Sequence, residues 1–533
     1  MAGKKDFAQG EQAAIARDVS QQGEWIPMID WSSTFPGNRG VNRHDKYELH
    51  DVPIGVRLSV EEAKKHGPIL TSNDQWEGAG ALQVKKTWKR DGKYHMLYVG
   101  YPDKSLSKNP GLGDTSFMCY ATSDDGYNWK RTNLGQVEWK GSKNNNIIAN
   151  APVDTPFEDP KAPPEERFKA IGQVGGTFDP DTGKKLDTDE AYKRWKQQEQ
   201  LGDKYTGPRM ESRHWVEGWT SPDAIHWKKI GKVGDFGSDG GNAAQYDAET
   251  DSYYAYIRVG GTGRRATGLS KTKNFWKWPP ANLVLFPDPQ DDPDVSFYSS
   301  SYFKYPTDPN LHCAFVGIYH QLGDFLDAQI AFSRNKTHWF RPERKAIIPI
   351  GEIGGTDTGG IGPWGGLIEL PDGKWATVYY GFYCLHNWLP SGKTEPTIKK
   401  HPGTLNLAIW DPHRFCSVEA QGEGRFTIPT VQPTKKELRL NFRCNTGGFI
   451  KVELIAGIPS RIHPDAKAIP GFSFEESEIL TGDHLNKTVS WNGNSDISKL
   501  IQKKSEEGIL GFGENGLAIR IQMFQAKLFA YSI

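Results

Sequence analysis

A short polar turn ending in a tryptophan recurs four times along this 533-residue chain. The clearest copies lie at 123–129 and 221–227, and weaker copies lie at 270–276 and 333–339. Each copy follows short segments rich in tyrosine and other aromatic residues, a composition typical of strands. A unit of strands that repeats at roughly 50 residues predicts a β-propeller, whose blades direct their loops toward one axis. We therefore expect a functional site assembled from residues that lie far apart in the sequence.

The expected fold is all-β, with a five-bladed β-propeller followed by a C-terminal β-sandwich. A seven-bladed ring is the alternative, because the N-terminal stretch could hold further strands. The polar insertion at about 175–207 should contain a short capped helix near 188–197. Toward the C-terminus the pattern changes to period two, as at 438–442 and 450–454, which is typical of half-buried antiparallel strands. The predicted domains are a wrapping segment at 1–75 that could close the ring, the propeller at 76–430 and the sandwich at 431–533.

Charge and cysteine content argue against several classes of partner. The chain carries 65 basic and 65 acidic residues, so neither nucleic acid nor an anionic membrane is expected as a partner. No apolar run approaches the roughly 20 residues of a membrane span. The five cysteines form no CxxC pair, which argues against a zinc site and a disulfide framework. We expect a monomer without an organic cofactor, cytosolic unless a secretory signal has been removed, in which case extracellular.

Propeller geometry predicts which residues face the axis, because inner strands begin on the face where the loops between second and third strands open. The candidates from inner-strand starts are Trp76, Glu77, Asp154, Asp239, Asp294, Tyr298 and Asp357. The candidates from the loops and strand ends are Arg213, His214, Arg258, Arg264, Arg265, Tyr319, His320, Tyr380, His386 and Trp388. The second group is basic and aromatic, and arginine matches a carboxylate with two parallel hydrogen bonds. This favours a substrate with an anionic group, although the same arginines could instead pair with the aspartates.

Among these candidates His320 is the leading residue for proton transfer, because imidazole titrates near neutral pH. Tyr298 and Tyr380 could supply a phenolic acid. The alternative for each is a structural, hydrogen-bonded side chain. A glycosidase would instead use Glu77 with Asp154 or Asp239, and a non-catalytic sugar-binding propeller would keep only the aromatic residues.

Two segments, 133–138 and 157–169, resemble the sialidase-like and invertase-like (glycoside hydrolase family 32-type) propellers of carbohydrate-degrading proteins. Within this group the chain is most similar to the fungal L-rhamnose-α-1,4-D-glucuronate lyases that trim gum arabic side chains. The resemblance covers most of the chain, including the C-terminal region. The invertase motifs Trp-x-Asn-Asp-Pro, Arg-Asp-Pro and Glu-Cys are not found at matching places, and the nearest string is 158–160. This departure puts a two-carboxylate hydrolase in doubt.

The resemblance implies an oligo- or polysaccharide substrate with a uronic acid, from which a terminal L-rhamnose leaves by β-elimination. It implies that an arginine neutralises the uronate carboxylate, and that an acid and a base act at C4 and C5. The catalytic residues expected on this basis are His320, Tyr298, Tyr380 and Arg264. The expected substrate-binding residues are Trp76, Glu77, Arg213, His214, Arg258, Arg265, Tyr319, His386 and Trp388. A Ca²⁺ ion in the channel would be held by Asp239, Asp294 and Asp357.

Overall fold

The computed structural model describes residues 25–41, 47–73, 75–78, 82–101, 116–152, 154–238, 241–261, 263–386, 402–431, 433–456, 467–500 and 517–533. Strands dominate these residues, as predicted. The chain divides into two compact units. The first comprises Met1–Glu61, Tyr305–Pro309 and Asp411–Ile533, and the second comprises Glu62–Lys304 and Asn310–Trp410. None of the helices in the described ranges is long and apolar enough to cross a membrane.

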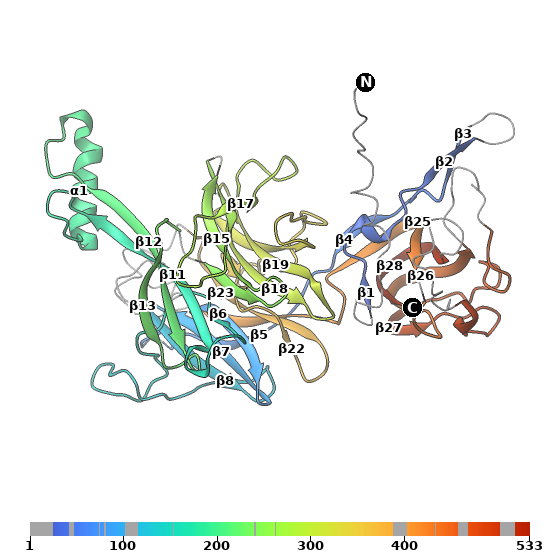
Figure 1. The fold of residues 1–533 in the computed structure, drawn as a ribbon, viewed down its shortest axis with the longest axis horizontal. Coiled ribbons are helices and arrows are strands. Elements are labelled where there is room, and N and C mark those ends of the chain that lie inside the picture. The colour runs from blue at the N-terminus through green and yellow to red at the C-terminus, as the bar shows by residue number, and fades with distance from the viewer. Residues whose placement is uncertain are drawn as a thin grey trace, which may run out of the picture. The chain divides into compact units, whose positions relative to one another are not determined.

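The second unit is a five-bladed propeller, which confirms the prediction (Figure 1). Blade 1 contains β6 (Leu82–Arg90), β7 (Lys93–Gly100), β8 (Phe117–Ser123) and β9 (Trp129–Arg131). Blade 2 contains β10 (Phe157–Glu158), β11 (Phe168–Phe178), β12 (Glu211–Ser221) and β13 (Lys228–Gly234). Blade 3 contains β14 (Ala243–Asp247), β15 (Ser252–Gly261), β16 (Arg264–Thr272) and β17 (Asn282–Leu285). Blade 4 contains β18 (Val295–Tyr305), β19 (Asp308–His320) and β20 (Phe325–Ser333).

Blade 5 is assembled from both ends of the ring. Its strands are β21 (Gly360–Gly362), β22 (Ile368–Glu369), β23 (Trp375–Phe382), β24 (Thr404–Trp410) and, from far upstream, β5 (Lys64–Thr71). Strand β5 pairs antiparallel with β24, so that Leu70 lies opposite Leu405 and Lys64 opposite Ile409. The N-terminal stretch thus closes the ring by supplying the outer strand of the last blade.

The recurring turn has the same hydrogen bonds in three of its copies, each of which follows the third strand of its blade. In blade 1, Oδ1 of Asp125 accepts from the backbone N–H groups of Tyr127 at 2.8 Å and Asn128 at 2.7 Å, and Trp129 Nε1 donates to the Gly126 carbonyl at 2.8 Å. The copies built on Asp223 in blade 2 and on Asn335 in blade 4 repeat these bonds. A carboxylate or amide that accepts local N–H groups fixes the turn. These aspartates are therefore structural.

Apolar clusters fill the spaces between neighbouring blades. One cluster joins Leu97 and Val99 of blade 1 to Phe168 and Trp219 of blade 2. Others join blade 2 to blade 3, blade 3 to blade 4, and blade 5 to blade 1. Because each blade buries both faces against its neighbours, the inner strands hold their polar side chains toward the axis.

The polar insertion extends the β11–β12 hairpin of blade 2 and carries α1 (Thr188–Leu201) at its tip (Figure 1). Asp187 caps the helix by accepting from the Glu190 N–H at 2.8 Å, which agrees with the predicted capped helix. Arg194 joins the helix to the hairpin through Asp179 at 2.9 Å. Short 3₁₀ helices lie at Trp31–Ser33, Pro164–Glu166, Gly202–Lys204 and Ser498–Leu500.

The first unit is the predicted sandwich, built around a six-stranded sheet. Its strands are β27 (Asp483–Thr488), β26 (Arg439–Ala456), β28 (Leu517–Ser532), β25 (Cys416–Val431), β4 (Arg57–Val60) and β1 (Ile26–Pro27). A separate hairpin contains β2 (Asn38–Val41) and β3 (Tyr47–His50). The three longest strands carry bulges, which let one sheet bend around an apolar core that includes Trp491.

Candidate active site

Five predicted residues from three blades come together near the propeller axis. We call Arg258, Arg265, Tyr298, Tyr319 and His386 the tyrosine–arginine cluster. His386 Nε2 and Tyr298 Oη lie 2.7 Å apart in a hydrogen bond. The guanidinium carbons of Arg258 and Arg265 lie 4.4 and 5.4 Å from the centre of the Tyr298 ring. The Tyr319 ring packs against His386, with 4.9 Å between ring centroids.

Each cluster residue stands where a strand reaches the same face of the ring. Arg258 lies near the end of β15 and Arg265 near the start of β16, so one hairpin of blade 3 presents both guanidinium groups. Tyr298 lies early in the inner strand β18, and Arg258 Nη1 donates to its backbone carbonyl at 2.8 Å. Tyr319 is the penultimate residue of β19, and its hydroxyl donates to Asp324 at 2.9 Å. The backbone N–H of His386 donates to the Asp324 carbonyl at 2.8 Å, and this bond holds the blade 5 residue beside blade 4.

Two further tyrosines, Tyr380 and Tyr101, interact electrostatically with Tyr298 of the cluster. Burial raises the pKa of Tyr380 well above its ordinary value, and the charges of Tyr298 and Tyr101 raise it further. The pKa of Tyr101 is also raised, first by burial and then by Asp154 and Tyr298. A raised pKa favours the neutral form of each phenol. Tyr101 uses its hydroxyl to donate to Gln83 at 2.7 Å.

A β-bulge in the inner strand of blade 1 adds two lysines to the axis. In β6, Val84 pairs with Tyr98 and Lys86 pairs with Leu97, so Lys85 is the extra residue. In an unbroken strand Lys86 would share the face of the fully buried Val84, and the extra residue turns it away from that face. The Lys85 ammonium lies 4.9 Å from the Trp364 ring centre and donates to Gln83 at 3.3 Å. Burial lowers the pKa of both lysines.

The carboxylates predicted at the axis each have partners within the fold. Glu77 is fully buried and accepts from Arg131 at 2.8 and 2.7 Å and from Tyr98. Asp154 accepts from the Gly241 N–H at 3.0 Å and the Asn242 amide at 3.1 Å, which join blade 2 to blade 3.

Two of the predicted calcium ligands are hydrogen-bonded in the same way. Asp294 accepts from the Leu322 N–H at 2.9 Å, and Asp357 pairs with Lys65 at 2.8 Å and Tyr379 at 2.9 Å. Asp239 lies outside the described residues. Within the described ranges no group of three or more His, Cys, Asp or Glu side chains is arranged to hold a metal ion. The calcium site stays a prediction.

Several predicted residues lie apart from the tyrosine–arginine cluster. His320 Nε2 is 3.1 Å from Asp327, and its ring stacks on Phe325. Burial lowers the pKa of His320, but the hydrogen bond and charge of Asp327 outweigh it, and the net pKa is raised. Arg264 donates to the Val295 carbonyl at 3.3 Å.

The insertion hairpin and blade 1 hold the remaining candidates. Arg213 pairs with Glu211 at 2.7 Å, and His214 lies opposite Gly175 in the same hairpin. Trp76 donates to Asn146 at 2.8 Å. Trp388 lies outside the described residues. The roles of these residues stay predictions.

Sequence reasoning missed Lys85, Lys86 and Gln83. Two adjacent lysines inside an otherwise apolar strand were the available signal, because a charged pair in an inner strand must face the axis or be buried at a cost. A bulge is not readable from residue types, so the second lysine would still have been placed on the wrong face.

Comparisons with known proteins give similarities to solved structures alone. No family model and no curated protein matches the sequence. A GH32 β-fructofuranosidase from Bombyx mori is 9% identical, with 89% of this chain and 94% of that chain covered at a TM-score of 0.37. A sucrose-6-phosphate hydrolase from Lactobacillus gasseri is 9% identical, with 88% and 93% covered at 0.38. A glycosyl hydrolase from Bacteroides ovatus is 14% identical, with 67% and 94% covered at 0.38. Similarity at this level carries no conclusion on activity.

Proposed function

We propose that the protein is a carbohydrate-active enzyme that acts on a uronate-containing oligo- or polysaccharide by β-elimination at the tyrosine–arginine cluster. The observation that carries the proposal is the 2.7 Å hydrogen bond between Tyr298 and His386 beside two arginines. It combines a proton-transfer pair with groups that recognise a carboxylate.

The chemistry of elimination assigns a role to each part of the cluster. Arg258 and Arg265 bind the uronate carboxylate and stabilise the enolate-like charge that develops when the C5 proton leaves. One member of the Tyr298–His386 pair takes that proton, and an acid delivers a proton to the oxygen at C4 as the C4–O bond breaks. A double bond forms between C4 and C5. Tyr380, whose phenol carries a proton at neutral pH, is the candidate acid.

The leaving group proposed is a terminal L-rhamnose, as in the lyases that the sequence resembles. His320 and Arg264 stay in the proposal as sequence-based candidates that act from the end of β19 in blade 4 and from the start of β16 in blade 3. A Ca²⁺ ion bound by Asp239, Asp294 and Asp357 also belongs to the proposal, since aspartate oxygens are suitable ligands.

Hydrolysis is the second candidate, and several structural neighbours are named as hydrolases. It requires two available carboxylates, about 5–9.5 Å apart. Glu77, one of the two expected, already accepts two bonds from Arg131 and one from Tyr98. A hydrolase would therefore need a carboxylate other than Glu77, and Asp154 and Asp239 are the remaining candidates.

One experiment separates the two reactions. The protein is incubated with oligosaccharides that end in rhamnose linked to glucuronate, and free sugar and ultraviolet absorbance are followed together. Rhamnose with a rise in absorbance identifies an eliminating enzyme, because the new double bond is conjugated with the carboxylate. Rhamnose without absorbance identifies a hydrolase. A substrate whose carboxylate is reduced to an alcohol is the matched control, and full activity on it contradicts elimination.

A further inference from the structure

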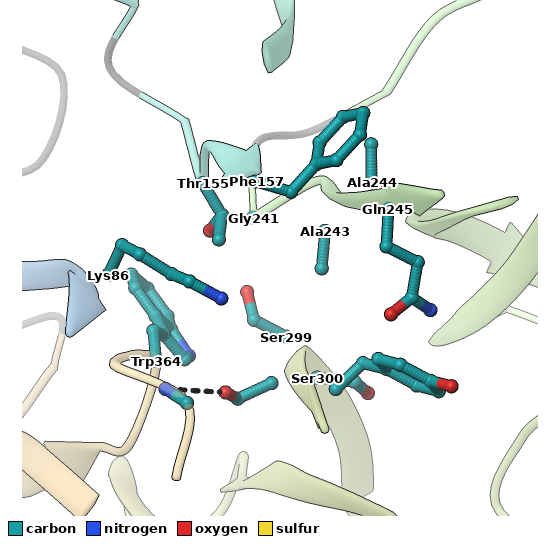
Figure 2. Close-up of a pocket in the computed structure, with 13 residues that line it drawn as sticks. Lys86, Thr155, Phe157, Gly241, Ala243, Ala244, Gln245, Ser299, Ser300 and Trp364 are labelled. Carbon is teal, nitrogen blue, oxygen red and sulfur yellow. Dashed lines mark hydrogen bonds between the residues drawn. The ribbon is translucent and has the colours of Figure 1, made fainter. Parts of the chain in front are cut away.

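A small cavity lies on the propeller axis, between inner strands of blades 1 to 4 and a loop of blade 5 (Figure 2). Its volume is about 40 Å³. Roughly 10–15 Å³ accommodates one water molecule, so the cavity has room for a few waters or one small ion. Polar side chains from four blades line it, and they include Lys86, Thr155, Gln245, Ser299, Ser300 and Ser301.

The ammonium group of Lys86 brings a positive charge to this cavity. Figure 2 shows its ammonium group reaching into the space above Ser299. No hydrogen bond or ion pair of its Nζ is found among the described residues. Burial lowers the pKa of Lys86, and the charge of Glu158 opposes this shift only in part. Lys86 is half-buried, and an ammonium that is partly removed from water without a partner anion loses solvation.

Trp364 supplies a second donor without an acceptor. Trp364 is buried, with 8% of its surface exposed. Its indole nitrogen is a buried polar atom for which no hydrogen-bond partner is found in the described part of the chain. The residue comes from the loop after β21 and lines the cavity beside Lys86. Buried donors of this kind are rare in folded proteins, where nearly all find an acceptor.

The charges around the cavity favour an anion over a cation. No aspartate or glutamate is among the described residues that line it. Two carboxylates act on the nearby lysines without lining the cavity: Glu158 lines a wider adjoining pocket of about 460 Å³, which Lys86 also lines, and Asp154 accepts bonds from blade 3. A cation would therefore meet an ammonium and an N–H group, whereas an anion would satisfy both.

We propose that this cavity is a binding site for a small inorganic anion of halide size, held by Lys86 Nζ and Trp364 Nε1. The Thr155 hydroxyl is a further donor at the same site. The site differs from the tyrosine–arginine cluster in residues and in ligand, so it does not depend on the reaction proposed above. An anion held here would tie blades 1 and 5 together at the axis.

The direct test is anomalous diffraction from crystals of the full chain in bromide. The expected result is a bromide peak within hydrogen-bonding distance of both Lys86 Nζ and Trp364 Nε1. Water or empty space at that position under saturating bromide would overturn the proposal. This measurement uses the unmodified protein, so it stands even if a variant fails to fold.

The solution test compares melting temperatures in chloride and in gluconate at equal ionic strength. The unmodified protein should show a saturable rise with chloride, since a ligand that binds only the folded state stabilises it. Lys86→Met should abolish this rise. Lys89→Met is the matched control, because Lys89 is an exposed lysine of the same strand, and it should retain the full rise. An equal chloride effect in both variants, or an equal effect of bulky gluconate, would contradict the site.

Discussion

At the scale of single residues, the Tyr298 hydroxyl is the most informative atom to remove. Tyr298→Phe keeps the ring that contacts Arg258 and Arg265 but deletes the bond to His386. We expect kcat to fall by about a hundredfold or more, the usual effect of losing a positioned proton-transfer group. Tyr127→Phe, which removes a turn hydroxyl bonded to Asp372, is the control and should leave kcat unchanged. A Tyr298→Phe variant with normal kcat would remove Tyr298 from the mechanism.

Arg258 tests whether the substrate carboxylate is recognised by shape as well as by charge. Arg258→Lys keeps the charge and loses the planar fork and the bond to the Tyr298 carbonyl. We expect kcat/KM on the uronate substrate to fall by roughly tenfold or more, equivalent to about 1.4 kcal/mol. On the carboxyl-reduced substrate the variant and the unmodified protein should be equally inactive. A variant that loses no activity on uronate would show that another group neutralises the carboxylate.

His320 makes a pH-dependent contribution to stability through Asp327. Its pKa is raised in the folded state, so the contribution is complete below the ordinary histidine pKa near 6.5 and is lost as pH rises through the raised value. His320→Ala should therefore lower the melting temperature more at pH 5.5 than at pH 8.5. Activity separates the two roles. A loss of turnover of about a hundredfold at unchanged melting temperature assigns His320 to proton transfer, and a loss that follows stability assigns it to structure.

At the scale of an element, the recurring turn depends on a backbone conformation that glycine adopts easily. Gly126 and Gly92 share a φ of +76°, but an added Cβ meets Leu370 Cδ2 at 2.7 Å in the first case and nothing within 4 Å in the second. Gly92→Ala should cost about 1 kcal/mol from backbone strain alone. Gly126→Ala should cost more, which urea unfolding of the two variants would measure. Equal losses would mean that the Leu370 side chain moves aside freely.

A second element, the β11–β12 hairpin, should release its helix in acid. The pKa of Asp179 is lowered to about 2, first by its bond to Arg194 and then by local backbone N–H groups. Its contribution is present above the ordinary aspartate pKa near 4 and is lost as pH falls toward 2. Hydrogen exchange of α1 should accelerate over that range, and Asp179→Asn should remove the pH dependence. Unchanged protection of α1 between pH 4 and 2 would contradict this attachment.

At the scale of the whole molecule, we expect the stability of the propeller ring to depend on the pairing of its closing strand β5 with β24. Leu70 is 7% exposed and pairs with Leu405. Leu70→Pro removes a ladder N–H and a core side chain together, so we expect a loss at least as large as the roughly 2–5 kcal/mol of a buried leucine truncation. Hydrogen exchange should increase in β24 and β23 first. Loss of protection confined to β5 would show that the ring is stable without its closing strand.

Much of the overall fold could be predicted from the sequence. The blades are recognisable because the Asp125 and Asp223 turns repeat and strands rich in aromatic residues lie between them. The axial candidates Arg258, Tyr298 and His386 followed from propeller geometry. Partners could not be predicted, since whether His320 pairs with Asp327 or with a substrate depends on side-chain direction. The bulge at Lys85 was also beyond reach, because one extra residue reverses the face of each side chain that follows it.

The outer strand of blade 5, β5, is synthesised long before β24, the strand with which it pairs. Lys64 pairs with Ile409, and the two residues are 409 − 64 = 345 positions apart in the sequence. At about 5–20 residues per second, a ribosome needs roughly 20–70 seconds to deliver the partner strand. Throughout that interval β5 is an open edge on a nascent chain, able to join a neighbouring polypeptide. Its lysines at 64 and 65 and its proline at 68 are residues that discourage such pairing, so the strand that completes the ring is also protected while it waits.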